Sequence, residues 1–207
     1  MGLEGFYVER IGYQEAMQLV VANHYLHRKA PCSLAFGLFH KDSLECLGVI
    51  CYGTPASSSL RKGLCGVDQV NNVYELTRLW VDDCVPKNGE SFLIGRTLRL
   101  LDKEIVVSFA DTSQEHLGVV YQATNWFYTG LSAKRTDWVV EGIDKHGHTW
   151  ADKYSAVEMR ELFGEKFSLQ ARSRKHRYVF FNASKKRKSE LLGLLRYPVL
   201  PYPKRSV

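Results

Sequence analysis

Residues 73–110, VYELTRLWVDDCVPKNGESFLIGRTLRLLDKEIVVSFA, decide the fold of this chain. The opening segment VYELTRLWVD (73–82) alternates apolar and polar residues and predicts a strand. CVPKNGES (84–91) is rich in turn residues, and SFLIGRTLRLLDKE (91–104) predicts a helix with Ser91 near its cap. IVVSFA (105–110) is a short apolar run that is typical of a buried strand. Strand, turn, helix and strand in this order indicate the centre of an α/β fold.

The sequence on both sides of this stretch adds further strands and helices. We expect strands at 5–11, 33–39, 46–52, 127–130, 136–143 and 174–181, helices at 13–26, 114–126 and 156–163, and a polar loop at 53–66. Helices separate some of these strands but not all of them. The pattern predicts an α/β fold with a central mixed β-sheet and helices on both of its faces.

Charge is distributed unevenly along the chain. Residues 1–165 hold 16 basic and 21 acidic residues, whereas residues 166–207 hold 12 basic residues and a single acid. We expect a core domain over 1–150 and a basic C-terminal extension over 151–207, which packs on the core because its YVFF run needs burial. Such asymmetry indicates a polyanionic partner, most often nucleic acid, and a solvated basic tail is the simpler alternative.

Composition excludes several classes of protein. The 207 residues are 45% hydrophobic and 24% charged, which is typical of a globular domain and not of a disordered or fibrous chain. No apolar run reaches the roughly 18 residues of a membrane span, and the N-terminus lacks the pattern of a secretory signal. The five cysteines form no C-x-x-C pair, so we expect free thiols and a cytoplasmic location.

Four segments carry a resemblance to known proteins: ANHYLHR (22–28), YELTRLWVDD (74–83), ESFLIGRTLRLL (90–101) and VSFADTSQEHLGVVYQATNWFYTG (107–130). The order of elements over Tyr74–Gly130 resembles the core of the GNAT acyltransferases. Together, the four segments resemble the Mom family of bacteriophage DNA-modification proteins. This resemblance implies a GNAT-like transferase that converts adenine in double-stranded DNA to N6-(carbamoylmethyl)adenine and so protects phage DNA from restriction.

The resemblance implies an active site at the end of the first predicted helix. It suggests His24 and Tyr25 there with iron nearby, and it matches Asp111 to the family's aspartate after the central strand. Imidazole, phenolate and carboxylate form a suitable ligand set for iron. Asp111 would otherwise accept a proton from the adenine N6 amine, or cap the helix that follows. The simpler role for His24 is likewise to cap or pack against its own helix.

Further catalytic candidates lie on the helix predicted at 114–126. His116 and Tyr121 are five residues apart, roughly 140° around a helix, so they share a face only in part. Tyr121 resembles the general acid of many GNAT proteins, and it would protonate a leaving group or stack on a flipped base. Its alternative is an ordinary core tyrosine, and Trp126 is also expected in the core.

In the GNAT fold, the turn before the long helix offers backbone N–H groups to the pyrophosphate of a CoA-type donor. The matching candidates here are Trp80, Val81, Lys87, Asn88, Gly89, Ser91 and Asn125. Glu90 and Ser91 stand where a basic, glycine-rich run is usual, which argues against ordinary acetyl-CoA chemistry. The donor of the carbamoylmethyl group therefore stays open. Arg78 and Trp80 are expected on one face of their strand, where Arg78 can meet a phosphate or a carboxylate.

Modification of adenine N6 in a duplex requires that the base leave the stack and enter a pocket with aromatic walls. The residues expected to grip the DNA phosphates are Arg61, Lys62, Arg172, Arg174, Lys175, Arg177, Lys185, Lys186, Arg187 and Lys188. The apolar stretch near 136–143 is a candidate contact for a homodimer.

Two other functions compete with adenine modification. One is a GNAT-type N-acetyltransferase that uses acetyl-CoA on an amine substrate, and the acidic turn argues against it. The other is a non-catalytic, DNA-binding anti-restriction protein. The joint presence of His24, Tyr25, Asp111 and Tyr121 argues against that function, because a pure binder has no need of them.

Overall fold

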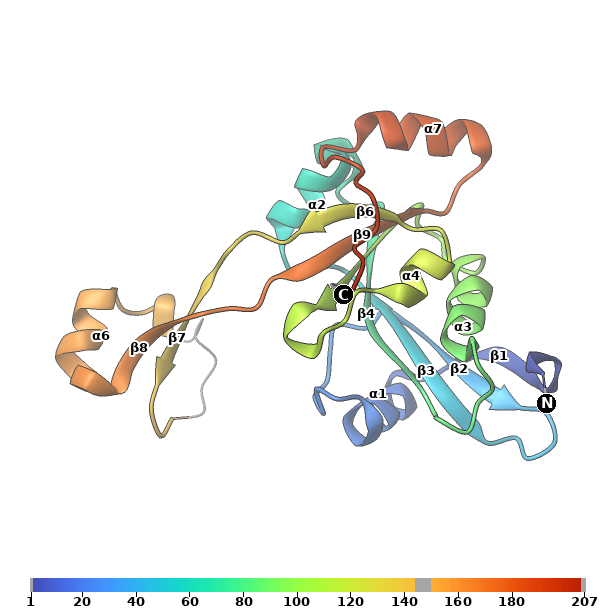
Figure 1. The fold of residues 1–207 in the computed structure, drawn as a ribbon, viewed down its shortest axis with the longest axis horizontal. Coiled ribbons are helices and arrows are strands. Elements are labelled where there is room, and N and C mark those ends of the chain that lie inside the picture. The colour runs from blue at the N-terminus through green and yellow to red at the C-terminus, as the bar shows by residue number, and fades with distance from the viewer. Residues whose placement is uncertain (1, 144–149, 206–207) are drawn as a thin grey trace.

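A computed structural model describes residues 2–143 and 150–205 (Figure 1). Its strands and helices, in chain order, are β1 (Phe6–Ile11), α1 (Tyr13–Asn23), β2 (Leu34–His40), β3 (Cys46–Gly53), α2 (Ser58–Cys65), β4 (Val73–Val81), α3 (Gly89–Leu98), β5 (Ile105–Asp111), α4 (Val119–Ala123), β6 (Phe127–Leu131), β7 (Thr136–Val140), α6 (Ala156–Phe163), β8 (Phe167–Ala171), β9 (Lys175–Phe181) and α7 (Lys185–Leu194). Short 3-10 turns at Leu3–Gly5, Val67–Gln69, Thr112–Gln114 and Gly164–Lys166 complete the described elements.

Seven strands form one mixed sheet in the order β1-β2-β3-β4-β5-β9-β6. β4 and β5 pair in parallel, and the other neighbouring strands pair antiparallel. The α/β class and the mixed sheet are therefore as predicted. The pairing of β3 with β4 contains a bulge, because Arg78 lies opposite Cys51 while Leu76 lies opposite Tyr52, which leaves Thr77 as the extra residue.

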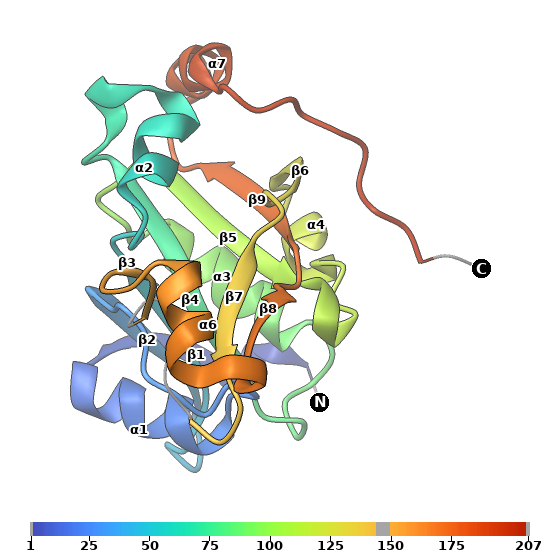
Figure 2. The ribbon, with the colours of Figure 1, turned by 90° about the vertical axis from the view of Figure 1, so that its left-hand side faces the viewer.

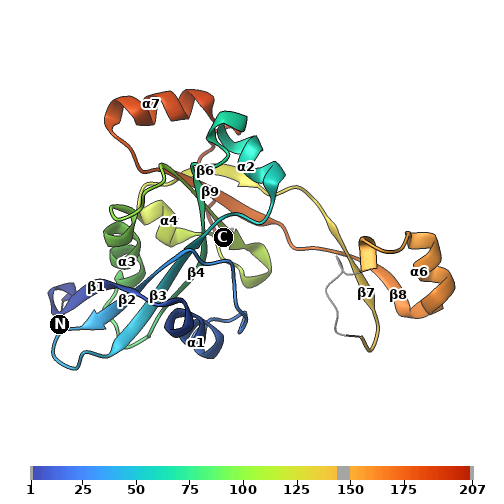
Figure 3. The same ribbon diagram turned by 180° about the vertical axis from the view of Figure 1, so that it is seen from behind.

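Helices cover both faces of this sheet, again as predicted (Figure 3). On one face, α3 and α4 bury Leu93, Ile94 and Tyr121 against inward residues of the central strands. On the other face, Ala16, Met17 and Val20 of α1 pack on β2 and β3. Leu64 of α2 and Leu191 of α7 cover that same face over β4, β5 and β9.

Two predicted elements differ from the structure for local reasons. The serine-rich stretch predicted as a loop contains α2, because the Ser57 side chain accepts from the Leu60 N–H and caps the helix. The helix predicted over 114–126 is only the short α4. Gly118 interrupts it with a positive φ of 72°, packed so closely on the Tyr178 ring that a Cβ would lie 2.4 Å from it. His116 and Tyr121 are thus not on one helix.

The segment predicted as a C-terminal extension contributes a strand to the central sheet. β9, from the segment expected as an extension, lies inside the sheet between β5 and β6. Its apolar YVFF run fills the centre of the core, as burial requires. The separate unit is β7, α6 and β8 (residues 136–171), here called the arm, which projects from the body (Figures 1 and 2).

Helices of the described residues are all too short or too polar to cross a bilayer. The five cysteines are free thiols, as predicted, and Cys51 and Cys65 are buried.

Candidate active site

β4 and β5 are paired only over their first residues, Val73–Leu76 of β4 with Ile105–Ser108 of β5. Both strands continue beyond this paired part. A cavity of about 880 Å³ lies where they separate. It is lined by residues from the end of α1, from β4, from the segment before α4 and from the base of the arm. A parallel pair that opens at its carboxyl ends is a common place for a ligand in α/β sheets.

Ser108 and Tyr121 meet at the point where the strands part. The Ser108 hydroxyl oxygen lies 3.1 Å from the Leu76 carbonyl oxygen and 2.8 Å from the Tyr121 hydroxyl oxygen. Burial raises the pKa of Tyr121 to about 12, against the opposing effect of the Ser108 hydrogen bond. Tyr121 lines the cavity, where it presents a protonated phenol, and it also belongs to the core, as its alternative role predicted.

One wall of the cavity is aromatic. The His24 and Tyr25 rings stack with centroids 4.4 Å apart, and His116 meets the Tyr25 ring edge-on at 5.6 Å. Tyr25 is 43% exposed, so a face of the wall is open to a ligand. The structure thus brings together three predicted site residues from two separate segments, 24–25 and 116.

The predicted iron ligands do not fit an iron site as the structure holds them. The His24 Nδ1 accepts from the Leu26 N–H at 3.1 Å, and burial, aided by the Arg78 charge, lowers the pKa of His24 to about 4. The ring is therefore neutral with its proton on Nε2, and neither nitrogen has a free lone pair. Burial raises the pKa of Tyr25, which keeps it a phenol. Across residues 2–143 and 150–205 no three His, Cys, Asp or Glu side chains converge as metal ligands.

Asp111 is occupied by bonds within the protein. Its Oδ1 accepts from the Ser113 N–H at 3.0 Å, the Ser113 hydroxyl at 2.9 Å and the Ser173 hydroxyl at 2.8 Å, and Lys175 lies 3.3 Å from Oδ2. Burial acts to raise the pKa of Asp111, but these hydrogen bonds and Lys175 outweigh it and lower the pKa to about 2. The predicted capping role is confirmed, and Asp111 is not among the residues that line the cavity.

Glu75 is a cavity residue that the sequence reasoning missed. It lies on β4, and burial raises the pKa of its carboxyl while Lys175 and Arg78 act to lower it. Within the described chain no hydrogen bond or ion pair holds this carboxyl. Simple alternation places Glu75 and Arg78 on opposite faces of the strand. The bulge at Thr77 turns both side chains to the same face. In the sequence, only the apolar neighbours of Glu75 indicated that this carboxyl is partly buried.

Arg78 contributes an available cation to the same cavity. Its Nη1 donates to the Thr77 carbonyl at 2.6 Å, and its Nη2 makes longer contacts of 3.5 and 3.4 Å with the carbonyls of Arg28 and Lys29. Its Nε is buried and finds no acceptor in the part of the chain that the structure describes. Trp80, on the same face as predicted, also lines the cavity. A buried guanidinium with an unused donor suits an anionic or carbonyl oxygen of a substrate.

Most of the residues predicted to bind a CoA-type donor lie outside the cavity. Trp80 and Val81 line the cavity, whereas Lys87, Asn88, Gly89, Ser91 and Asn125 do not. A Cβ on Gly89 would lie 2.7 Å from Val85 and 3.1 Å from Val81, so close packing against these valines requires a glycine here. Glu90 adds a carboxylate to the cavity at the helix start, where it would repel one. Asn125 ends α4 with a φ of 61° and is exposed.

The predicted basic residues divide into two groups. Arg172, Lys175 and Arg177 line the cavity near the base of the arm, together with Arg135. Arg172 forms an ion pair with Asp137, and Arg177 is buried, with its guanidinium on Thr129 and 3.5 Å from the Tyr197 ring centroid. Arg174 donates to the Ser132 carbonyl at 2.7 Å instead of reaching outward.

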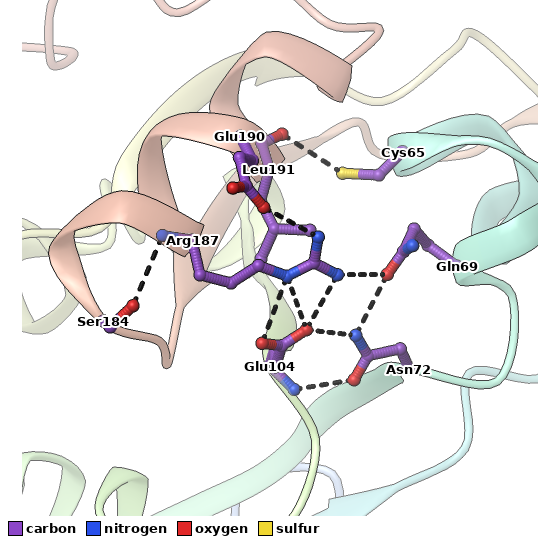
Figure 4. A network of polar contacts seen from close by, with 8 residues as sticks. All are labelled: Cys65, Gln69, Asn72, Glu104, Ser184, Arg187, Glu190 and Leu191. Carbon is purple, nitrogen blue, oxygen red and sulfur yellow. Dashed lines mark hydrogen bonds and ion pairs between the residues drawn. The ribbon is translucent and has the colours of Figure 1, made fainter.

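The other group lies on α2 and α7. Lys62, Lys185 and Lys186 are exposed there, whereas the buried Arg61 Nε has no partner in the described residues, and Lys188 covers the Phe180 ring at 5.0 Å. Arg187 has a structural role: it binds Glu104 at 3.0 Å and Glu190 at 3.2 Å and so fastens α7 to the body (Figure 4). The residues predicted to grip DNA phosphates therefore lie at two separate places on the molecule.

Known proteins are similar to this chain in sequence and in fold. A model of the Mom protein family matches residues 5–204. Methylcarbamoylase mom of Escherichia phage Mu is 28% identical over 212 aligned residues, covering 95% of this chain and 83% of that protein. A structure assigned as a phosphinothricin N-acetyltransferase aligns with a TM-score of 0.50 and 10% identity over 86% of this chain and 99% of its own.

The ribosomal-protein-S5-alanine acetyltransferase of Vibrio fischeri gives a TM-score of 0.50 with 9% identity, over 89% of this chain and 97% of its own. At such identities these two structures show the GNAT acetyltransferase fold alone. The family model, by contrast, spans the whole sheet, the cavity and the arm. The chain belongs to the Mom protein family.

Proposed function

We propose that this protein modifies adenine in double-stranded DNA to N6-(carbamoylmethyl)adenine and thereby protects phage DNA from restriction. The observation that carries the proposal is one cavity that combines an aromatic wall of His24, Tyr25 and His116 with cations at its mouth. Membership of the Mom family and the name of the phage Mu relative support the same reaction. We infer that it acts in the host cytoplasm.

The cavity suits a base that has left the duplex. Extrusion costs a few kcal/mol, and stacking on an aromatic ring offsets about 1–3 kcal/mol of that. Tyr25 offers its open ring face to the adenine, with His24 behind it. Arg135, Arg172 and Lys175 at the mouth would hold the flanking phosphates without reading the sequence.

Glu75 is the group best placed to accept the proton of the N6 amine. As the bond from N6 to the methylene carbon forms, the N6 proton passes to Glu75, and the bond from that carbon to the leaving group breaks. The leaving group keeps the bonding electrons and takes a proton from Tyr121. Arg78 would bind the carbonyl oxygen of the transferred group. Our sequence-based assignment of the base to Asp111 stays a prediction, but its hydrogen bonds favour Glu75 for that role.

The N-acetyltransferase alternative has less support. The carboxylate of Glu90 in the cavity would repel the pyrophosphate of acetyl-CoA, and Lys87, Asn88 and Gly89 do not line the cavity. The binding-only alternative leaves the unpaired Glu75 and the buried Tyr121 without a purpose in the cavity.

Mass spectrometry of nucleosides from the DNA of expressing cells tests the proposal. Cells with the wild-type chain should yield a deoxyadenosine that carries a carbamoylmethyl group, and an empty vector should not. Glu75→Gln should lose the product, and Glu9→Gln, an exposed strand carboxyl on β1, should keep it. Unmodified DNA from cells with folded wild-type protein that still binds duplex DNA would favour the binding-only function.

A further inference from the structure

The arm has its own small core and a helix face that nothing in the described chain covers. Val140, Met159 and Phe167 form the core, with Trp138 and Phe163 packed against it. Ala156, Met159 and Phe163 of α6 point into that core at i, i+3 and i+7. The opposite side of α6 is its outer face, formed by Val157, Glu158, Glu161 and Leu162.

This outer face is apolar and acidic together. Val157 is 62% exposed and Leu162 is 60% exposed, with Glu158 and Glu161 beside them. Residues 136–171 carry seven acidic and four basic residues, a net charge of −3. The rest of the chain carries 24 basic and 15 acidic residues, a net charge of +9. The arm would therefore be repelled by DNA phosphates and attracted by the body of another copy.

α7 carries a face of the complementary kind. Leu191 and Arg187 fasten one side of the helix to the body (Figure 4). The other side, its outer face, holds Lys185, Lys186, Ser189, Leu192 and Gly193. A shallow depression is lined by Lys185, Lys186, Ser189 and Glu190, and a Cβ on Gly193 would meet nothing within 4 Å. Small residues one helical turn apart let a second helix approach closely.

We propose that the outer face of α6 docks on the outer face of α7 of a second copy of this chain. Glu158 and Glu161 would meet Lys185 and Lys186, and Val157 and Leu162 would cover Leu192. One chain carries both halves of the contact. α6 lies on the projecting arm and α7 at the top of the body, so the two helices are at separate places on the molecule (Figure 1). If α6 of each copy docks on α7 of the other, a dimer with two-fold symmetry contains this contact twice.

Two expected properties distinguish this dimer from a chain whose basic residues only bind polyanions. The contact rests on few apolar residues and on exposed charges, so the dimer should weaken as salt rises. It also occupies the lysines of α7, which leaves the cations at the cavity mouth as the DNA surface. The proposal does not depend on the reaction, because it can be tested without DNA.

Sedimentation velocity of the full chain without DNA tests it. The wild type should be a dimer at low salt and dissociate at high salt. Glu158→Lys with Glu161→Lys should give a monomer, and so should Lys185→Glu with Lys186→Glu. All four reversals together should restore the dimer, because opposite charges face each other again. Val157→Asp with Leu162→Asp should be monomeric, with an unchanged circular dichroism spectrum showing that the arm is folded.

A reversal of charge on the exposed Lys29 and Lys41 serves as the matched control and should leave the dimer intact. A wild type that is monomeric at every concentration overturns the proposal. So does a dimer that none of these variants changes. If reversal of Lys185 and Lys186 weakens binding to duplex DNA but not self-association, α7 is a nucleic-acid surface and the proposal is wrong.

Discussion

Glu75 and Asp111 carry carboxyl groups on neighbouring parallel strands, but the two groups have very different surroundings. Glu75, in the middle of β4, lines the cavity, and no hydrogen bond in the described chain holds it. Asp111, at the end of β5, accepts three hydrogen bonds and faces Lys175, and it lies outside the lining. Burial raises the pKa of Glu75, while the bonds of Asp111 bring its pKa down to about 2.

The difference shows that position at the carboxyl end of a strand is not enough to make a catalytic group. A carboxylate whose lone pairs are already used is a weak base and a good structural cap. A half-buried carboxylate that accepts no hydrogen bond has a raised pKa, and this makes it the stronger proton acceptor of the two. Four substitutions should break or sharpen this comparison.

Glu75→Gln should have the largest effect. The amide cannot accept the N6 proton, so the modification rate should fall by about 10²–10³-fold. Because the substitution removes a charge whose burial is unfavourable, the melting temperature should not fall. The wild-type rate should decrease as pH drops through the raised pKa of Glu75, and the variant should lose this dependence. Steady-state rates on duplex DNA across pH, with thermal melts, measure all three.

Tyr25→Ala should have the next largest effect, because it removes the open ring of the aromatic wall. Loss of one stacked base is worth about 1–3 kcal/mol, so productive binding of the flipped adenine should weaken by about 10- to 100-fold. Tyr25→Phe keeps the ring and should retain most of the activity. Fluorescence of an adenine analogue in duplex DNA reports the flipped base. Equal losses in the two variants would mean that the hydroxyl, not the ring face, is used.

Asp111→Asn should act mainly on stability. The folded pKa of Asp111 lies below its unfolded value, so its charge stabilises the fold above pH ~4, and this contribution is lost as pH falls toward ~2. The variant should lower the free energy of unfolding by about 1–2 kcal/mol at neutral pH and match the wild type near pH ~2. Urea titrations at several pH values measure it. Abolished modification with unaltered stability would instead identify Asp111 as the base.

Arg135→Gln should give the smallest effect. Arg135 is exposed at the cavity mouth, and removal of one phosphate contact should lower the slope of log affinity against log salt by about one. The loss should be similar for unrelated DNA sequences. Arg99→Gln, an exposed cation at the end of α3, is the matched control. Fluorescence anisotropy with labelled duplexes over a salt series distinguishes the two, and equal slopes for both variants would remove Arg135 from the DNA surface.

The central elements of this fold were predictable from local patterns. The alternation in 73–82 and the apolar run at 105–110 have the period of strands, so both strands were assigned correctly. The helix between them was also predicted, although it begins at Gly89 and ends at Leu98 instead of running over 91–104. α2 and the length of α4 were missed, because a serine cap and the close packing of Gly118 on Tyr178 outweigh the local composition. β8 is a short polar strand that only its pairing with β7 defines.

For the site, the sequence by itself determined which side chains were available: the His24–Tyr25 pair, Tyr121, Arg78 and a surplus of basic residues toward the C-terminus. Only the tertiary structure decided their use. The insertion of β9 beside β5 brings Ser173 and Lys175 to Asp111 and occupies it, and the bulge at Thr77 turns Glu75 toward Arg78. Such contacts join residues far apart in the chain, and a local pattern carries no information about partners that folding alone brings together.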